Sequence, residues 1–159
     1  VGIHVRRAKN PVNPDEPAYS ENPFYVNLMH HLHEDMSDNY YVKAMNYFKE
    51  KGYDKFKVFS DDIYWCKKQE MFKGCEFASH QKCDCEFLGI KGCKDSREST
   101  TELEDMNTMA SCIGHIIANS SFSWWAAYIA PYTQKVIAPK AWYSDGIIRT
   151  ECPDSWTRL

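Results

Sequence analysis

The sequence predicts an α/β domain of three layers, in which a mostly parallel sheet of about five strands is covered by helices on both faces. Short apolar runs typical of buried strands alternate along the chain with amphipathic helical patterns. A length of 159 residues with 43% hydrophobic content suits the core of one such domain. Polar clusters directly follow three of the predicted strands, as ligand-binding residues do in parallel sheets.

The chain begins with a predicted buried strand over residues 1–7, followed by a loop that contains several prolines. Asn22 followed by Pro23 resembles a helix start, because proline is favoured at the first helical position. We therefore expect a helix over residues 23–36.

Ser37 is a candidate cap for a second helix that ends before Gly52. Its apolar residues recur at the helical spacing i, i+3, i+4 and i+7, namely Tyr41, Ala44, Met45 and Phe48. A strand is expected over residues 55–60, and a helix over residues 63–69 follows it.

The second half repeats this alternation. A short strand is expected over residues 75–78, and an irregular Cys- and Lys-rich segment leads to a helix that begins near residue 99 and runs through Cys112. Strands are expected over residues 115–119 and 135–139. Between them a serine turn should lead into a short helix whose predicted buried face is Phe122, Trp125, Ala126 and Ile129.

Composition excludes some classes of partner. The net charge of −3 gives no broad basic field, so no nucleic-acid partner is expected. No apolar run approaches the roughly 20 residues of a membrane span, so no membrane contact is expected from this segment. Seven cysteines, an odd number, favour reduced thiols and hence a cytoplasmic location.

Three polar clusters should meet where parallel strands end, because ligands of such sheets bind outside the carboxyl ends of the strands. The serine turn precedes a helix N-terminus, which attracts anions, and adjacent arginines supply planar donors that match phosphate oxygens. The sequence thus predicts a pyrophosphate site, although neither a Walker loop nor G-x-G-x-x-G is present. The clusters are His4, Arg6 and Arg7; Ser60, Asp61 and Asp62; and Ser120, Ser121 and Ser123.

Three segments resemble, in order and with similar spacing, the donor-binding half of glycosyltransferase family 11, the α-1,2-fucosyltransferases. They are VGIHVRR, KVFSDDIYWCK and DMNTMASCIGHIIANSSFSWWAAYIAPYTQKVIAPKAWY. The family motifs read approximately HxRRGD, FSDDxxW and HxIxANSSFSWWxA. The resemblance implies one Rossmann-like half of a two-domain GT-B enzyme. It further implies GDP-fucose as donor, transfer to a glycan acceptor with inversion at the anomeric carbon of fucose, and no cofactor or metal.

By position, the resemblance assigns Arg6 and Arg7 to the diphosphate as the catalytic pair and His4 to the nucleotide pocket. It places the turn of Ser121, Phe122 and Ser123 against the phosphates. Asp61 and Asp62 match the family's paired acids.

The sequence departs from the family pattern at Ala8 and Lys9, where the family usually has Gly-Asp. In addition, the family's acceptor domain precedes the HxRR strand. We therefore expect residues 1–159 to be the donor-binding domain, with an N-terminal acceptor domain missing. A Golgi membrane location would apply if the full-length protein carries an N-terminal anchor.

Other interpretations remain open for the same residues. The arginines could be surface salt-bridge partners, His4 a core histidine, and the serines or acids plain helix caps. The departure at Ala8 and Lys9 also allows a nucleotide-sugar binding domain without catalysis. A zinc-stabilised interaction module is a further alternative, with the ligand candidates Cys75, His80, Cys83, Cys85 and Cys93.

Overall fold

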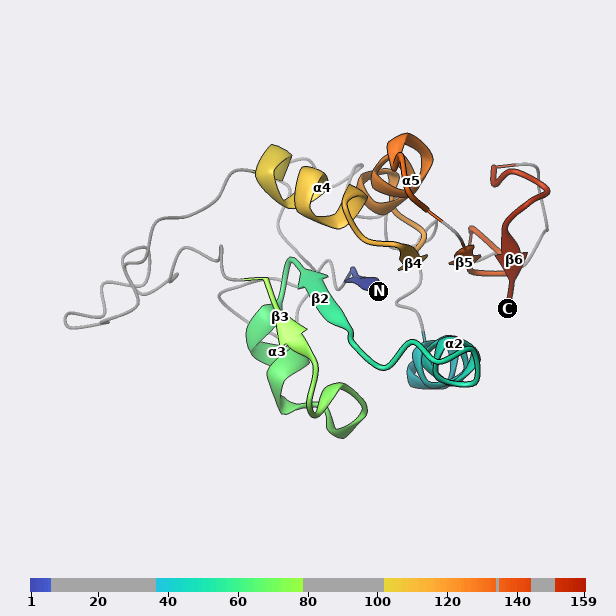
Figure 1. Ribbon diagram of the computed structural model, residues 1–159. Coiled ribbons are helices and arrows are strands. Elements are labelled where there is room, and N and C mark those ends of the chain that lie inside the picture. The colour runs from blue at the N-terminus through green and yellow to red at the C-terminus, as the bar shows by residue number, and fades with distance from the viewer. Residues whose placement is uncertain (7–36, 79–101, 134, 144–150) are drawn as a thin grey trace.

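A computed structural model of the chain describes residues 1–6, 37–78, 102–133, 135–143 and 151–159. Within these ranges the strands form one parallel sheet in the order β3-β2-β1-β4-β5-β6 (Figure 1). This is the strand order of dinucleotide-binding Rossmann domains, so the predicted α/β fold class is confirmed. The strands are β1 (Gly2–Val5), β2 (Lys57–Ser60), β3 (Glu76–Phe77), β4 (Gly114–Ile116), β5 (Lys135–Ala138) and β6 (Thr157–Arg158).

Helices cover both faces of this sheet. Figure 1 shows α4 (Glu102–Ala110) and α5 (Ser121–Ile129) together on one face, whereas α2 (Asp38–Lys49) and α3 (Ile63–Lys68) lie on the other. A short 3₁₀ helix, η1 (Glu70–Phe72), follows α3. The helix predicted over residues 23–36 lies outside the described residues.

The boundaries of α2 follow from its sequence. The Ser37 hydroxyl accepts a hydrogen bond from the backbone N–H of Tyr40 at 3.3 Å, which satisfies one of the open donors of the first turn. After the helix the chain reverses at Gly52, whose φ of +85° favours a residue without a side chain. The predicted apolar face is buried: Tyr41, Ala44, Met45 and Phe48.

Alternation along the strands divides the core into two clusters. In β2, Val58 packs with α2 and α3, whereas the next residue, Phe59, packs on the face covered by α4 and α5. Ile3 and Val5 of β1 lie on the same side as Val58. Both faces of the central strands are therefore apolar, as expected for a parallel sheet covered on both sides.

Two expectations need correction. The sheet has an additional strand, β6, whose two residues pair with Ile137 and Ala138 of β5. The predicted buried face of α5 is wrong in part, because Trp125 and Ile129 are half exposed. Its buried residues are small, namely Ser123, Ala126 and Ala127, and they allow α5 to pack closely against α4.

Candidate functional site

The candidate site lies where the strand order of the sheet changes direction. From β1 the chain proceeds outward to β2 and β3, and from the neighbouring β4 it proceeds the opposite way to β5 and β6. In open parallel sheets, ligands bind at such a point, in a crevice outside the carboxyl ends of the strands, and here these are the ends of β1 and β4. We call this expected binding place the donor crevice. Arg6 directly follows β1, and Ser120 directly precedes α5.

Arg6 and Asp61 join two of the predicted clusters. Arg6 Nη1 lies 2.9 Å from Asp61 Oδ2, and the side chains are 47% and 29% exposed. The parallel register of β1 and β2 pairs Val5 with Ser60, which brings the residues after both strands to the same edge. The ion pair holds the guanidinium there while leaving it accessible to a ligand.

The three residues of the Ser60-Asp61-Asp62 segment have different partners. Ser60 Oγ accepts a hydrogen bond from the backbone N–H of Asp62 at 2.9 Å, which closes the turn after β2. Asp62 Oδ1 in turn accepts from the backbone N–H of Trp65 at 2.9 Å and caps α3. Asp62 thus holds a helix start, whereas Asp61 pairs with Arg6.

His4 connects β1 to α5 through buried contacts. Its Nδ1 lies 2.9 Å from the Ser123 hydroxyl, and its ring centroid lies 5.0 Å from that of Phe122. Burial lowers the pKa of His4 to about 4; the negative charge of Asp61 opposes this effect and Arg6 adds to it. The imidazole is therefore neutral near pH 7.

The serine turn begins α5 in a form suited to an anion. Ser120 makes no side-chain capping hydrogen bond, and the first intrahelical bond runs from Trp124 N to the Ser120 carbonyl. The backbone N–H groups of residues 121–123 precede that bond, so they point out of the helix end toward the crevice.

The serine side chains are not equivalent. Ser123 is fully buried, and its hydroxyl lies 3.3 Å from the Ser120 carbonyl oxygen and 3.4 Å from that of Ala118. Ser121 is exposed and Ser120 is half-buried. A ligand at this helix end would meet backbone N–H groups and the first two hydroxyls, whereas Ser123 supports His4.

Tyr41 is a supporting residue that the sequence did not reveal. Its hydroxyl donates to the backbone carbonyl of His4 at 3.3 Å and so ties α2 to the strand that carries the site. It belongs to the helical repeat of apolar residues and therefore resembled a core residue only. A tyrosine in place of phenylalanine was the available signal, because a buried hydroxyl needs a partner.

The second histidine of the resembling motifs, His115, lies in β4 and is fully buried. Its Nε2 donates to the Met109 carbonyl at 2.8 Å, and its Nδ1 lies 3.0 Å from the Thr133 hydroxyl. Because a carbonyl only accepts, Nε2 carries the proton and Nδ1 accepts from Thr133. Burial lowers the pKa of His115 to about 4. Its partners assign it a structural role.

Some sequence-based predictions fall on residues that the structure does not describe. Arg7 lies outside the described residues, as do four of the five candidate zinc ligands, His80, Cys83, Cys85 and Cys93. In the described part of the chain, no group of three or more His, Cys, Asp or Glu side chains is placed to hold a metal ion. None of the helices described is long and apolar enough to span a bilayer.

Comparisons with known proteins show which proteins this chain resembles in sequence. The model of the family described as Glycosyl transferase family 11 matches residues 23–157. An alpha-1,2-colitosyltransferase of Escherichia coli is 35% identical over 134 residues, which cover 80% of this chain and 41% of that protein. The O-antigen biosynthesis glycosyltransferase WbnK of Escherichia coli is 26% identical over 159 residues, 99% of this chain and 43% of that protein.

The chain therefore spans about two fifths of the length of these relatives. No solved structure is significantly similar to it.

Proposed function

We propose that this chain, which belongs to glycosyltransferase family 11, is the donor-binding part of a fucosyltransferase. The enzyme would transfer L-fucose from GDP-fucose to a glycan hydroxyl, and galactoside O-2 is the expected acceptor atom. One observation carries the proposal. The exposed guanidinium of Arg6 follows β1 and the open N-terminus of α5 follows the neighbouring strand β4, so both lie at the carboxyl ends of the strands where parallel sheets of this order bind nucleotides.

The chemistry of the leaving group explains why such a site would be catalytic. Breaking the bond between fucose C1 and the β-phosphate oxygen leaves negative charge on GDP, and donors fixed around the phosphates stabilise it. Each important donor of this kind lowers a barrier by roughly 3 kcal/mol. Arg6, Arg7 and the first N–H groups of α5 are the proposed donors. Their positive charge also supports transfer without a metal ion.

His4 is proposed to line the nucleotide pocket as a neutral group. Its Nδ1 is engaged by Ser123, and among the described residues Nε2 has no hydrogen-bond partner. With the phosphates held by Arg6, Nε2 remains for a neutral polar group of the nucleoside. A neutral imidazole also suits this position because a charged one would lie beside Arg6.

The acceptor site and the general base are proposed to lie in a second domain of a GT-B enzyme. The curated relatives are more than twice as long as the stretch that they share with this chain. Acceptor positioning and exclusion of water would come from that domain, and positioning alone supplies about 7–11 kcal/mol of a barrier. The 159-residue chain should therefore bind the donor and hydrolyse it slowly at most.

A second donor is favoured by one specific comparison, because the relative with 35% identity is named a colitosyltransferase. Colitose is fucose without its 3-hydroxyl group. A pocket that hydrogen-bonds this hydroxyl would reject the deoxy sugar by a factor of about 10⁴, whereas an apolar pocket would accept both. The ratio of the two rates therefore identifies the donor.

Radiolabelled GDP-fucose and GDP-colitose, offered with a panel of galactosides to this chain and to a version extended upstream, test the proposal. The extended protein should transfer fucose in excess chelator, and the short chain should not. Preference for GDP-colitose would reassign the sugar. Donor binding without turnover by the extended protein would favour the non-catalytic alternative. Robust transfer by the short chain would contradict the assignment of the acceptor site to another domain.

A further inference from the structure

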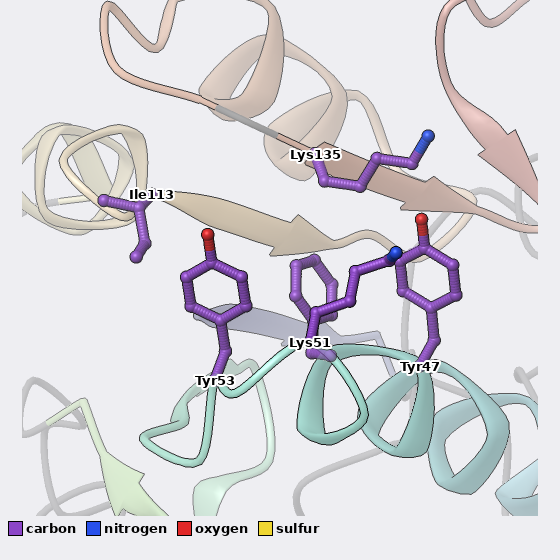
Figure 2. Close-up of a pocket in the computed structure, with 6 residues that line it drawn as sticks. Tyr47, Lys51, Tyr53, Ile113 and Lys135 are labelled. Carbon is purple, nitrogen blue, oxygen red and sulfur yellow. The ribbon is translucent and has the colours of Figure 1, made fainter.

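A hollow of about 230 Å³ lies on the edge of the sheet opposite to the donor crevice (Figure 2). Its walls come from the end of α2, the turn after it, and the starts of β4 and β5. The donor crevice, by contrast, lies at the carboxyl ends of β1 and β4. The two sites are therefore separated by the length of the strands. The lining residues are Tyr47, Phe48, Lys51, Tyr53, Ile113 and Lys135.

Aromatic rings give the hollow a fixed apolar wall. Phe48 is buried and meets both tyrosines edge to face, with ring centroids 5.8 Å from Tyr47 and 6.0 Å from Tyr53. Gly114 leaves space for this ring, because a Cβ added there would lie 2.5 Å from Phe48 Cε1. The rings are thus held in place by the start of β4, and flat faces of this kind accept the apolar face of a ring-shaped ligand.

Two ammonium groups supply the charge at this site. Lys51 Nζ lies 5.0 Å from the ring centroid of Tyr47. In Figure 2 the ends of Lys51 and Lys135 and the hydroxyl of Tyr47 lie toward the same end of the hollow. Neither lysine forms an ion pair with another described residue, and none of the lining residues is acidic. A chain with a net charge of −3 thus carries a local positive site.

We propose that this hollow binds an anionic ligand with a six-membered ring, namely a sugar or aryl group that bears a phosphate or carboxylate. The anion would lie between the ammonium groups of Lys51 and Lys135, and the ring would lie against Tyr47 and Tyr53. The Tyr47 hydroxyl, which lies at the same end of the hollow, would add a hydrogen bond to the anion. Charge-assisted contacts and ring stacking act together here, so neither an inorganic anion nor a neutral ring should bind as well.

The test titrates phenyl phosphate into Arg6→Ala protein, in which the proposed donor crevice is weakened, and follows the backbone amide signals by NMR. Signals of Tyr47, Lys51 and Tyr53 should move together along one saturable curve. Inorganic phosphate and phenol should each bind about tenfold more weakly, because each keeps only one kind of contact. Binding at this site can therefore be confirmed even if the proposed transfer reaction is not observed. Likewise, the transfer reaction can be confirmed even if this site binds no ligand.

The double variant that carries Lys51→Ala and Lys135→Ala should bind phenyl phosphate at least tenfold more weakly than Arg6→Ala protein with both lysines intact. Lys67→Ala is the matched control, because Lys67 also lies over a ring, that of Phe77 at 6.0 Å, but does not line the hollow. It should change the affinity less than twofold. Equal weakening by the control, absence of saturable shifts, or equal binding of inorganic phosphate would overturn the proposal.

Vesicles distinguish the sources of such a ligand. If the ligand is a lipid headgroup, vesicles that contain phosphatidylinositol, whose headgroup is a six-membered ring with a phosphate, should sediment the protein. They should not sediment the double variant, and phosphatidylcholine vesicles should sediment neither protein. If neither kind of vesicle sediments the protein but phenyl phosphate still binds, the site would be assigned to a soluble ligand. Failure of vesicles and phenyl phosphate together would contradict the site.

Discussion

The guanidinium of Arg6 and the carboxylate of Asp61 lie 2.9 Å apart at the ends of the neighbouring strands β1 and β2. Both side chains are partly exposed, so the pair contributes at most about 1 kcal/mol to stability. Its larger consequence is geometric. A flexible arginine is held at the carboxyl ends of β1 and β2 before a ligand arrives, and less conformational freedom is then lost on binding.

Arg6→Ala should weaken GDP binding by about 10–100-fold, because hydrogen bonds to charged groups contribute about 1.5–3 kcal/mol. Arg6→Lys should lose less affinity for GDP, because the positive charge remains and only the planar guanidinium, which can donate two hydrogen bonds side by side, is removed. Calorimetric titration with GDP measures both affinities. Equal affinities of the alanine variant and the unaltered chain would exclude Arg6 from the phosphate site.

Asp61→Asn should weaken GDP binding several-fold while leaving the free energy of unfolding within about 1 kcal/mol of its original value. The reason is that Arg6 loses its orienting partner but nothing is left unpaired in the core. The double variant with Arg6→Ala should bind no worse than Arg6→Ala alone. Additive losses in this double-mutant cycle would show that Asp61 contacts the ligand independently.

Ser123→Ala should lower the free energy of unfolding by about 1–3 kcal/mol, because it leaves the buried Nδ1 of His4 without its partner. Ser121→Ala is the matched control on the same turn of α5. Its side chain is exposed, so its effect on stability should stay within about 0.5 kcal/mol. Urea denaturation measures the free energy of unfolding of both variants. If Ser123→Ala were as stable as Ser121→Ala, the Ser123 hydroxyl would not support His4 as we propose.

Stability should fall as the pH is lowered from 6.5 toward 4. In the folded chain burial lowers the pKa of His4 and of His115 from 6.5 to about 4. Between these values the unfolded chain binds more protons than the folded chain, so acid favours unfolding; above pH 6.5 the full stability is present. Each histidine should account for about 2 kcal/mol of the loss between pH 7 and pH 5.

Urea denaturation at the two pH values measures this loss. His115→Gln should be less stable at pH 7, because the hydrogen bonds to Met109 and Thr133 are altered. Its stability should depend about half as steeply on pH as that of the unaltered chain. An unchanged slope would mean that His115 does not titrate as a buried neutral group.

The elements that the sequence predicted best are those in which side-chain burial decides the structure. The helix α2 repeats apolar residues at helical spacing between a serine cap and a glycine, and each of these signals is local. The strand β6 was missed because its two residues, Thr157 and Arg158, are defined by backbone pairing to β5. No pattern of hydrophobicity marks a strand of that length.

The helix α5 shows why hydrophobicity alone misassigned a face. Trp125 and Ile129 are more apolar than Ser123, yet Ser123 is buried and they are half exposed. Close packing of α5 against α4, and of Ser123 against His4 of β1, selects small side chains, and this requirement depends on the distances between elements. For the same reason the sequence located the serine turn at the site, but did not show that Ser123 points inward to His4.

Calorimetric titration of the 159-residue chain with GDP-fucose, GDP, a UDP-sugar and ADP, in excess chelator, tests the central claim most directly. The account predicts saturable binding of GDP-fucose and GDP, at least tenfold weaker binding of the UDP-sugar and ADP, and about 10–100-fold weaker binding of GDP to Arg6→Ala. Equal affinity for all four nucleotides, absence of binding, or binding that returns only with Mn²⁺ or Mg²⁺ would contradict it.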